Sequence, residues 1–394
     1  MNVLTFTTLY PNAITPHHGV FVENRLRHLV ASGEVASRVV APVPWFPFGG
    51  ARFGRYADLA SIPSQEIRFG IRVLHPRFPV VPKVGMNLAP HLLFRFVRPM
   101  ISRMVMKGAR CDLIDAHYFY PDGVAAIMLG KALNKPVVVT ARGSDLNIIS
   151  HFRRPRGMIK WAAHNAQGLV TVCQALKEEL IKLDVERDSV QVFRNGVDLE
   201  LFRPLDRSTV QNQLGVKSPV LLSVGNLISL KGHDLVIRAL SLISGAVLMI
   251  VGKGPDERSL RGLVTALGLE QRVLFLGPIQ HERMPEIYNA ADVLILASER
   301  EGWANVLLEA MACGTPVAAT DVSGTPEVVT SEVAGVLFRE RTPLGIANAV
   351  SRVLTNPPHR GATRAYAERF SWSETTAGQL RLFRRVLSDW SKSQ

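Results

Sequence analysis

Short apolar runs rich in Val, Ile and Leu recur along the chain and alternate with longer amphipathic stretches. Runs of four to six residues suit strands that are buried on both faces, and helix-length segments between them favour right-handed βαβ crossovers and parallel sheets. The runs are VLTFT (3–7), RVVAP (38–42), LIDAH (113–117), VVVTA (137–141), GLVTV (168–172), VQVF (190–193), VLLSV (220–224), AVLMIV (246–251), RVLFL (272–276), DVLILA (292–297) and PVAAT (316–320). The pattern predicts an α/β protein.

The runs form two series, and a chain of 394 residues is too long for one ordinary core. The break lies at 195–206, where turn residues and a proline gather. We therefore predict two Rossmann-like domains, 1–197 and 198–375, facing across a cleft. A helix at 376–394 is expected to return to the first domain, with one apolar side formed by Leu380, Leu382, Phe383 and Val386. Ligands of open parallel sheets bind beyond the carboxyl ends of the strands, so residues there are the site candidates.

Composition narrows the function classes. The formal charge of +13 favours anionic partners, but no zinc-finger spacing or aromatic–basic motif is present, so nucleic acid is not expected. The three cysteines form no CxxC pair, which indicates a reducing compartment. The N-terminus lacks the pattern of a signal peptide, and the longest uncharged stretch, 239–252, is too short to span a bilayer as a helix. We expect a cytoplasmic protein.

The most specific motif is SEREGWANVLLEAMACGTPVAAT, at 298–320, directly after an expected strand. Glu301 falls in the loop, and Glu309 falls on an expected helix from Trp303 to Cys313 that Gly314 ends. Free amides at the start of this helix could receive oxygen ligands. Eight helical steps separate the glutamates by about 12 Å, beyond the roughly 5–9.5 Å of a glycosidase pair. Both could instead be surface helix charges.

Two further loops follow strands of the second domain. SVGNLISLKGHD, at 223–234, contains Gly225, Asn226 and Lys231, and a cation here could neutralise a phosphate leaving group. VGKGP, at 251–255, holds the pair Gly252 and Gly254 around Lys253. The third glycine of GxGxxG is replaced by Glu257, which weakens a dehydrogenase interpretation. A tight turn without ligand contact is the alternative for this loop.

The first domain offers its own candidates. Gly19 precedes an amphipathic helix and could admit a phosphate to free amides, or could simply form the turn into the helix. His117 ends an expected strand, where a satisfied polar group is the common alternative. Asp122 and Asp145 are weaker candidates for acceptor binding, and helix capping is at least as good an explanation for Asp145.

At these motifs the chain resembles the GT4 family of retaining glycosyltransferases, which share the GT-B fold, and it is similar to members that build bacterial polysaccharides. Glu301 and Glu309 match the E-x7-E signature, Lys231 and Gly232 match the lysine–glycine step, and His117 matches an active-site histidine. The resemblance implies that His117, Lys231 and Glu301 are catalytic. It implies a donor site formed by Gly19, Gly225, Asn226, Lys231, Gly252, Lys253, Gly254, Glu301, Gly302, Trp303, Ala304, Asn305, Val306 and Glu309. We add Arg142 and Arg194 to this donor site as candidate cations.

Two positions depart from the family pattern. Ala304 stands where the family usually has Gly or Pro, and Asn226 stands where it usually has an arginine. Asn226 can still donate a hydrogen bond, but the missing positive charge must come from elsewhere. Arg194 and Arg142 each follow a strand of the first domain and are the candidates, with a structural ion pair as the alternative for each.

The expected reaction transfers a sugar from a nucleotide sugar, UDP- or GDP-linked, to a glycan or lipid-linked acceptor with retention of anomeric configuration. Retention follows from the resemblance. No D-x-D motif occurs, so neither a metal nor another cofactor is expected. A nucleotide-sugar epimerase of the same architecture and a non-catalytic nucleotide-sugar-binding protein are the alternative functions.

A basic amphipathic stretch covers 79–110. Leu93, Phe96, Val97, Met100, Ile101 and Met104 form an apolar stripe, flanked by Arg95, Arg98, Arg103 and Lys107. Such a helix could lie on the inner face of an anionic membrane, which would make the protein peripheral, or it could pack on the first sheet with its basic side in solvent.

Overall fold

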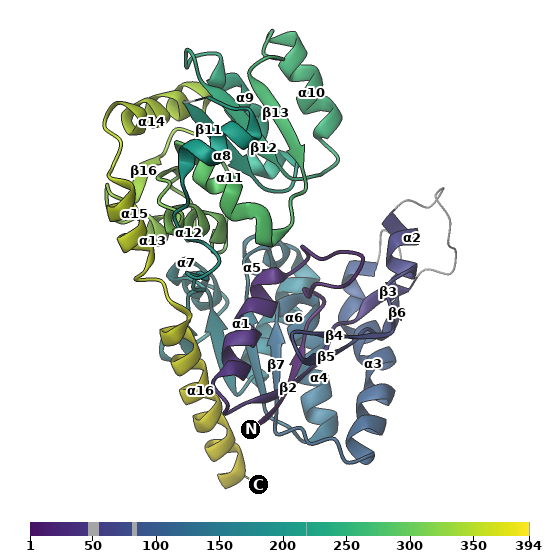
Figure 1. Ribbon diagram of the computed structural model, residues 1–394. Helices are drawn as coiled ribbons and strands as arrows, with labels where there is room; N and C mark the ends of the chain where they lie inside the picture. Colours follow the sequence, from purple (N-terminus) through teal and green to yellow (C-terminus); the bar gives the residue numbers. More distant parts are fainter. Residues whose placement is uncertain (46–54, 81–84, 218, 394) are drawn as a thin grey trace. The chain divides into compact units, whose positions relative to one another are not determined.

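The computed structural model describes residues 1–45, 55–80, 85–217 and 219–393 (Figure 1). The chain forms two compact units. Unit 1 comprises Met1–Arg194 together with Ser373–Gln394, and unit 2 comprises Asn195–Trp372.

Unit 1 is built on a large sheet in the strand order β10-β9-β8-β7-β1-β2-β5-β4. All neighbouring strands are parallel except β4 and β5, and a separate parallel pair joins β3 to β6. Its strands are β1 (Asn2–Phe6), β2 (Ala36–Val40), β3 (Val43–Trp45), β4 (Gln65–Arg68), β5 (Ile71–Leu74), β6 (Arg77–Pro79), β7 (Leu113–His117), β8 (Val137–Ala141), β9 (Gly168–Thr171) and β10 (Val190–Val192).

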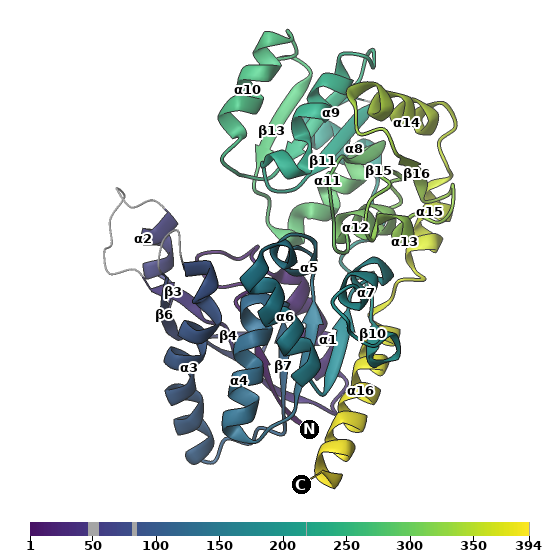
Figure 2. The same cartoon turned by 180° about the vertical axis from the view of Figure 1, so that it is seen from behind.

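Helices cover both faces of this sheet, as the two opposed views show (Figures 1 and 2). The α-helices are α1 (Val20–Ala31), α2 (Arg55–Ala60), α3 (Ala89–Met106), α4 (Val124–Leu133), α5 (Ser144–Asn147), α6 (Arg153–Asn165), α7 (Gln174–Ile181) and α16 (Trp372–Lys392). The short helices are η2 (Gly85–Asn87), η3 (Phe119–Gly123), η4 (Ile149–His151) and η5 (Arg187–Ser189).

Unit 2 contains a second sheet in the order β13-β12-β11-β14-β15-β16, in which every neighbouring pair is parallel. Its strands are β11 (Val220–Val224), β12 (Val247–Val251), β13 (Val273–Gly277), β14 (Val293–Leu296), β15 (Val317–Thr320) and β16 (Gly335–Phe338). Its helices are α8 (Arg207–Leu214), η6 (Ser229–Lys231), α9 (His233–Leu240), α10 (Glu257–Ala266), η7 (His281–Arg283), α11 (Met284–Ala290), α12 (Asn305–Ala312), α13 (Thr325–Val328), α14 (Pro343–Thr355) and α15 (Arg360–Ala367).

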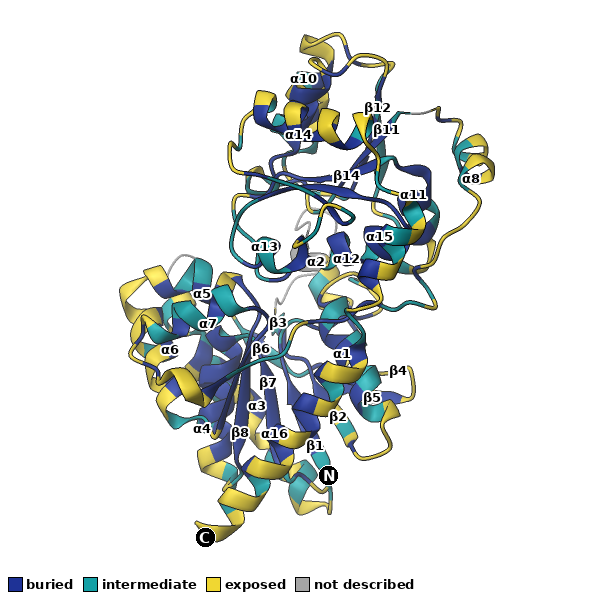
Figure 3. Ribbon diagram, turned by 90° about the vertical axis from the view of Figure 1, so that its left-hand side faces the viewer, coloured by how far each residue is buried: buried dark blue, intermediate teal, exposed yellow. Residues whose placement is uncertain are grey.

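Each sheet has its own apolar core, and the central strands, such as β7 and β8, are dark blue in Figure 3, whereas β4 at the edge is not. In unit 1, Val22 and Leu26 of α1 share a cluster with Val3 of β1 and Val138 of β8. The same cluster includes the four apolar residues predicted for the C-terminal helix, because α16 packs on this sheet. In unit 2, α9, α10 and α14 contribute to the equivalent cluster.

The apolar runs located eleven strands, but five strands escaped them. β4 and β5 form an antiparallel edge hairpin in which β4 has no buried residue, so no continuous apolar run marks it. Phe69 and Gly70 turn the hairpin with φ of 48° and 77°, where glycine is favoured. β3 and β6 are three residues each, and β16 is a short strand at the other edge of the second sheet.

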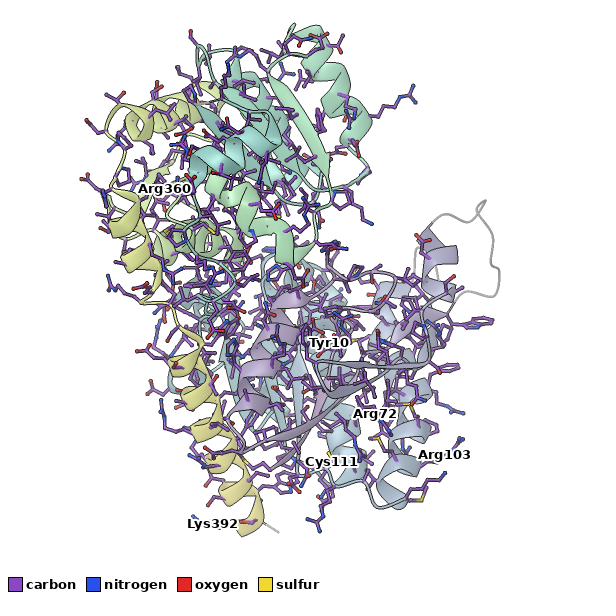
Figure 4. The ribbon with its side chains drawn as sticks, viewed as in Figure 1. Tyr10, Arg72, Arg103, Cys111, Arg360 and Lys392 are labelled. Carbon is purple, nitrogen blue, oxygen red and sulfur yellow. The ribbon has the colours of Figure 1, made fainter. Side chains whose placement is uncertain are left out.

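The predicted basic stretch at 79–110 is α3 over most of its length, and its residues 81–84 lie outside the described part of the chain. Leu93, Val97 and Ile101 are buried against the rest of unit 1, whereas Phe96 is half exposed. The stripe is therefore divided: one side packs into the unit, and the basic side, including Arg103 labelled in Figure 4, faces solvent.

Candidate functional site

In unit 2, glycines allow the loops after β11 and β12 to run in contact. A Cβ on Gly252 would lie 1.8 Å from the carbonyl oxygen of Gly225, and one on Gly254 would lie 2.2 Å from that of Leu227. Gly252 and Gly225 also have φ of 142° and 152°. Backbone hydrogen bonds join the loops, from Gly225 N to Val251 O and from Leu227 N to Lys253 O, each 3.0 Å. No other residue type would permit this approach.

Lys231 lies against Gly225, in the contact between the loops after β11 and β12. Its aliphatic carbons lie within 3.7 Å of the position that a Gly225 Cβ would occupy, and its ammonium nitrogen lies 2.5 Å from Oε1 of Glu301. The lysine side chain is 22% exposed and the glutamate side chain 12%, so both can reach a ligand from solvent. The structure therefore brings together two of the three predicted catalytic residues, from the loops after β11 and β14.

Arg341 connects these two loops and was not among the predicted site residues. Its Nε donates to Ala297 O at the end of β14 (2.8 Å), and its Nη2 donates to Ser229 O in η6 (3.3 Å). Gly232 has φ of 67°, and a Cβ there would lie 2.4 Å from the same Ala297 oxygen. The arginine lies just after β16, far along the chain from either motif, and no local pattern indicates it.

The helix that carries Glu309 begins later than predicted. α12 starts at Asn305 instead of Trp303. Ala304 has φ −83° and ψ 85°, which is not helical, and the indole of Trp303 donates to Asn195 O (3.1 Å). Asn305 Oδ1 accepts from the Asn195 side chain (3.2 Å). The helix ends at Ala312 rather than Cys313, before Gly314 with φ of 79°. The predicted range was therefore too long at both ends.

Glu309 projects from α12 and accepts a hydrogen bond of 2.7 Å from the Tyr288 hydroxyl at Oε2. Burial, together with the charge of Glu309, raises the pKa of Tyr288 well above its usual value, so the phenol stays a donor. Glu309 is itself only partly buried, and Gly302 and Val306 are exposed to the same intermediate degree, whereas Ala304 is buried. The carboxylate is thus held in one orientation with part of its surface accessible.

Asn226 and Lys253 are exposed at the tips of the two glycine loops. The backbone of Lys253 takes part in the pairing of the loops, because its carbonyl accepts from Leu227 N (3.0 Å), whereas the Asn226 carbonyl accepts from Ile228 N within its own loop (2.9 Å). The side chains are therefore available to an incoming ligand.

In unit 1, His117 is the centre of a buried polar network. Its Nε2 lies 3.2 Å from Oδ2 of Asp115, and its Nδ1 lies 2.6 Å from Nη2 of Arg142. Gln379 of α16 donates to the same Asp115 oxygen (3.0 Å) and accepts from Nε of Arg25 (2.9 Å). The network therefore links α1, β7, the loop after β8 and the C-terminal helix.

The network fixes the protonation of its members. Burial, aided by the nearby Arg142, lowers the pKa of His117 to about 4 against the opposing effect of Asp115. Arg142 can only donate, so Nδ1 must accept and Nε2 carries the hydrogen toward Asp115. Burial opposes ionisation of Asp115, but the attraction of His117, Arg25 and Arg142 holds its pKa below the usual value. The histidine is thus neutral at pH 7, with both nitrogens engaged.

The two predicted acceptor-binding aspartates are both buried and tied to backbone. Asp122 accepts from Thr8 N (2.6 Å) and from the hydroxyls of Thr7 and Thr8. Burial outweighs these bonds and raises the pKa of Asp122 to about 7. Asp145 accepts from the amides of Phe119 (2.8 Å), Gly143 (2.7 Å) and Arg142 (3.2 Å), and burial raises its pKa also. These carboxylates brace the loops that follow β1, β7 and β8.

Gly19 is the N-cap of α1, with φ of 77°. A Cβ would lie 2.4 Å from the carbonyl carbon and oxygen of Leu9, so the helix start packs directly on the loop after β1. Arg194, the last residue of the first segment of unit 1, is exposed, whereas Arg142 is buried and its Nη2 belongs to the His117 network.

The sequence matches two family descriptions. "Glycosyltransferase Family 4" matches residues 19–201, and "Glycosyl transferases group 1" matches residues 206–370. A D-inositol 3-phosphate glycosyltransferase of Saccharomonospora viridis is 34% identical over 366 residues, covering 85% of this chain and 84% of that protein. A putative teichuronic acid biosynthesis glycosyltransferase, TuaC of Bacillus subtilis, is 28% identical over 359 residues, with 89% of each chain covered.

Solved structures share the fold. A sucrose-phosphate synthase from Thermosynechococcus elongatus has a TM-score of 0.81 at 20% identity, covering 98% of this chain and 99% of that chain. Anabaena HepE in complex with UDP has a TM-score of 0.74 at 20% identity, covering 98% and 100%.

Two parallel-sheet units of this kind define the GT-B fold, and the protein is a glycosyltransferase. The chain belongs to glycosyltransferase family 4. Within the described residues, no helix has the length and apolarity to cross a bilayer. Nor do three or more His, Cys, Asp or Glu side chains of that part of the chain gather as metal ligands would.

Proposed function

We propose that the protein transfers a sugar from a UDP- or GDP-linked donor to a glycan or lipid-linked acceptor, with retention and without a metal. The observation that carries the proposal is the placement of Lys231 on the paired glycine loops of unit 2. A diphosphate approaching these loops would meet glycine backbone without side chains and one ammonium group together. The structure of Anabaena HepE in complex with UDP supports a nucleotide as the ligand of this fold.

The chemistry needs charge neutralisation more than a base. The bond between the anomeric carbon and the diphosphate oxygen breaks, and negative charge grows on that oxygen. Lys231 stabilises this charge, and electrostatic contacts of this kind lower the activation barrier by about 3–4 kcal/mol. The acceptor oxygen bonds to the anomeric carbon on the same face, and its proton passes to the departing phosphate. The atoms balance without a protein base.

The remaining residues of unit 2 then bind the donor. Glu301 holds the ammonium group of Lys231 and accepts from sugar hydroxyls, and Glu309, oriented by Tyr288, accepts from ribose hydroxyls. Asn226 and Lys253, exposed at the loop tips, contact the diphosphate or base. Gly302, Trp303, Ala304, Asn305 and Val306 supply backbone at the start of α12.

In unit 1 we propose that His117 acts as a neutral orienting group near the sugar. Its nitrogens are held by Asp115 and Arg142, so a proton-transfer role would require breaking a buried hydrogen bond. Gly19 admits the donor phosphates at the start of α1, and Arg194 supplies positive charge that Asn226 does not. Asp122 and Asp145 shape the acceptor side through the loops that they brace.

The relatives favour transfer over isomerisation. Both sequence relatives described above carry transferase names, and the name of the Bacillus subtilis protein refers to a cell-wall polymer. We therefore propose an acceptor in cell-surface or exported polysaccharide synthesis, met at the cytoplasmic face of the membrane.

The test begins with a panel of UDP-, GDP- and ADP-sugars, scored by the rise in melting temperature, because a ligand of the native state stabilises it. The stabilising donor is then assayed for release of nucleoside diphosphate, with and without acceptor glycans and with EDTA. Replacement Lys231→Met should lower kcat more than a hundredfold. Lys217→Met, at an exposed lysine of the same unit, should leave kcat unchanged.

Several outcomes would refute the proposal. Isomerised sugar from donor alone would identify an epimerase, and tight binding without nucleotide release for any acceptor would identify a binding protein. An inverted linkage in the product by NMR would refute retention, and complete loss of activity with EDTA would refute the metal-free mechanism.

A further inference from the structure

A groove of about 780 Å³ lies in unit 1 beside the N-terminal parts of α3, α4 and α6. α4 packs between α3 and α6, and the three helices lie side by side in Figure 2. Val124 and Met128 of α4 and Met158 of α6 give the groove an apolar lining. Arg153, Arg154 and Trp161 of α6 give it two cations and an aromatic ring.

The charge around this groove is of one sign. α3, α4 and α6 contain no Asp or Glu, and they carry eight cations: Arg95, Arg98, Arg103, Lys131, Arg153, Arg154, Arg156 and Lys160. Among the described residues, Lys160 is the cation of this set that forms an ion pair, with Asp184, and both side chains of the pair are exposed. Three adjacent helices of unit 1 therefore carry positive charge without an acidic residue of their own.

Exposed apolar side chains accompany the cations. Phe96 of α3 is 50% exposed, Phe152 before α6 is 49% exposed and Trp161 is 36% exposed. The ammonium group of Lys131 lies 5.0 Å from the centre of the Trp161 ring, so charge and aromatic surface occur together. A soluble anion would be attracted by the cations alone and would gain nothing from these rings. An amphiphile uses both.

We propose that the groove of α3, α4 and α6 binds the phosphate headgroup of an anionic membrane lipid, with Phe96 and Trp161 entering the interface beside it. Cations near an anionic leaflet and aromatic rings at the headgroup level are the two terms that hold a protein on a membrane. Nucleic acid is disfavoured because, among the described lining residues, Trp161 provides a single aromatic ring beside Val and Met side chains, whereas base stacking uses a series of rings. The inference deepens the proposed function, since it names the surface at which a lipid-linked acceptor is reached.

Vesicle sedimentation of the full chain, without donor or acceptor, tests the proposal. Vesicles of phosphatidylcholine with 30% phosphatidylglycerol should bind the protein, pure phosphatidylcholine should not, and salt should weaken binding. The double replacement of Arg153 and Arg154 by Gln should lower the partition coefficient about 30-fold, the factor expected for two cations at an anionic surface. The control is Arg381→Gln with Arg385→Gln, which removes the same charge from exposed positions of α16.

Trp161 provides a local readout. Brominated phosphatidylglycerol should quench tryptophan fluorescence in the wild type, and Trp161→Phe should remove most of that quenching while the protein still binds. Equal loss of binding in the two arginine pairs would overturn the groove as the site. So would binding of inorganic phosphate or single-stranded RNA that excludes vesicles. Because no donor is present, failure here leaves nucleotide release by Lys231 intact, and the two proposals fail separately.

Discussion

Gln379 offers the sharpest test of the buried network in unit 1. The residue is 2% exposed, and its amide connects Oδ2 of Asp115 (3.0 Å) to Nε of Arg25 (2.9 Å), both of which are buried. Replacement by Leu preserves approximate volume but leaves one donor of a buried cation and one acceptor of a buried anion unsatisfied. Each hydrogen bond to a charged group contributes about 1.5–3 kcal/mol, so we expect a loss of about 3–5 kcal/mol in the stability of unit 1.

Hydrogen exchange read by mass spectrometry measures this effect in the intact chain and separates the units. Amides of β7 should exchange at least a hundredfold faster in Gln379→Leu, since 1.4 kcal/mol corresponds to a factor of ten, while amides of β11 should be unaffected. The matched control is Gln174→Leu, which removes a 2.9 Å bond to the exposed Glu178 and should change exchange less than threefold. If both variants behave alike, the network does not hold the C-terminal helix.

Three further predictions follow from single contacts. Gly252→Ala should destabilise unit 2 by more than about 2 kcal/mol, because its Cβ would lie 1.8 Å from Gly225 O, whereas Gly262→Ala, in open space on α10, should stabilise it by about 0.5–1 kcal/mol; urea unfolding measures both. The folded pKa of Asp122 is raised from 3.8 to about 7, so its contribution to stability is complete below pH 4 and is lost as pH rises to 7. Asp122→Asn should therefore gain up to about 4 kcal/mol relative to wild type between pH 4 and pH 8 in thermal melts, and a parallel pH profile would contradict this. Arg341→Met should lower kcat/KM for donor about tenfold, through displacement of Lys231 and Glu301, with melting changed by only a few degrees, and unaltered kinetics would exclude a positioning role.

The sequence predicted the two-sheet architecture because buried parallel strands are continuous apolar runs. Eleven strands follow that rule, and LIDAH, VVVTA and VLLSV have the predicted bounds. The edge strands do not follow it. β4 pairs on one side only and buries none of its residues, so its sequence QEIR carries no apolar run. Edge hairpins are recognised from turn residues, and FG at 69–70 was the available signal.

The residues of the candidate site also fall into two groups, those that local motifs predicted and those that they did not. Gly225, Gly252 and Lys231 were identified because each follows a buried strand within a few residues, and parallel sheets bring such loops to one edge. Arg341, Tyr288 and Gln379 were missed. Each acts through a partner far away in the chain, from 21 residues for Tyr288 to 354 for Gln379, and nothing in the local sequence distinguishes it from an ordinary surface or core residue. Tertiary partners of this kind require the fold.

Both units have polar groups in the loops that follow their strands, but the burial of these groups differs between the units. In unit 1, His117, Asp122 and Asp145 are buried and bonded to their own unit, and burial shifts the pKa of each toward its neutral form. In unit 2, Lys231, Glu301 and Glu309 keep partial exposure. A group that must follow charge developing on a ligand has to be reachable and ionised, whereas a group that must hold a loop in one geometry gains from being buried and saturated. On the proposed function, we therefore infer that the charge chemistry of transfer lies mainly in unit 2, and that the buried polar residues of unit 1 fix the loops on the acceptor side.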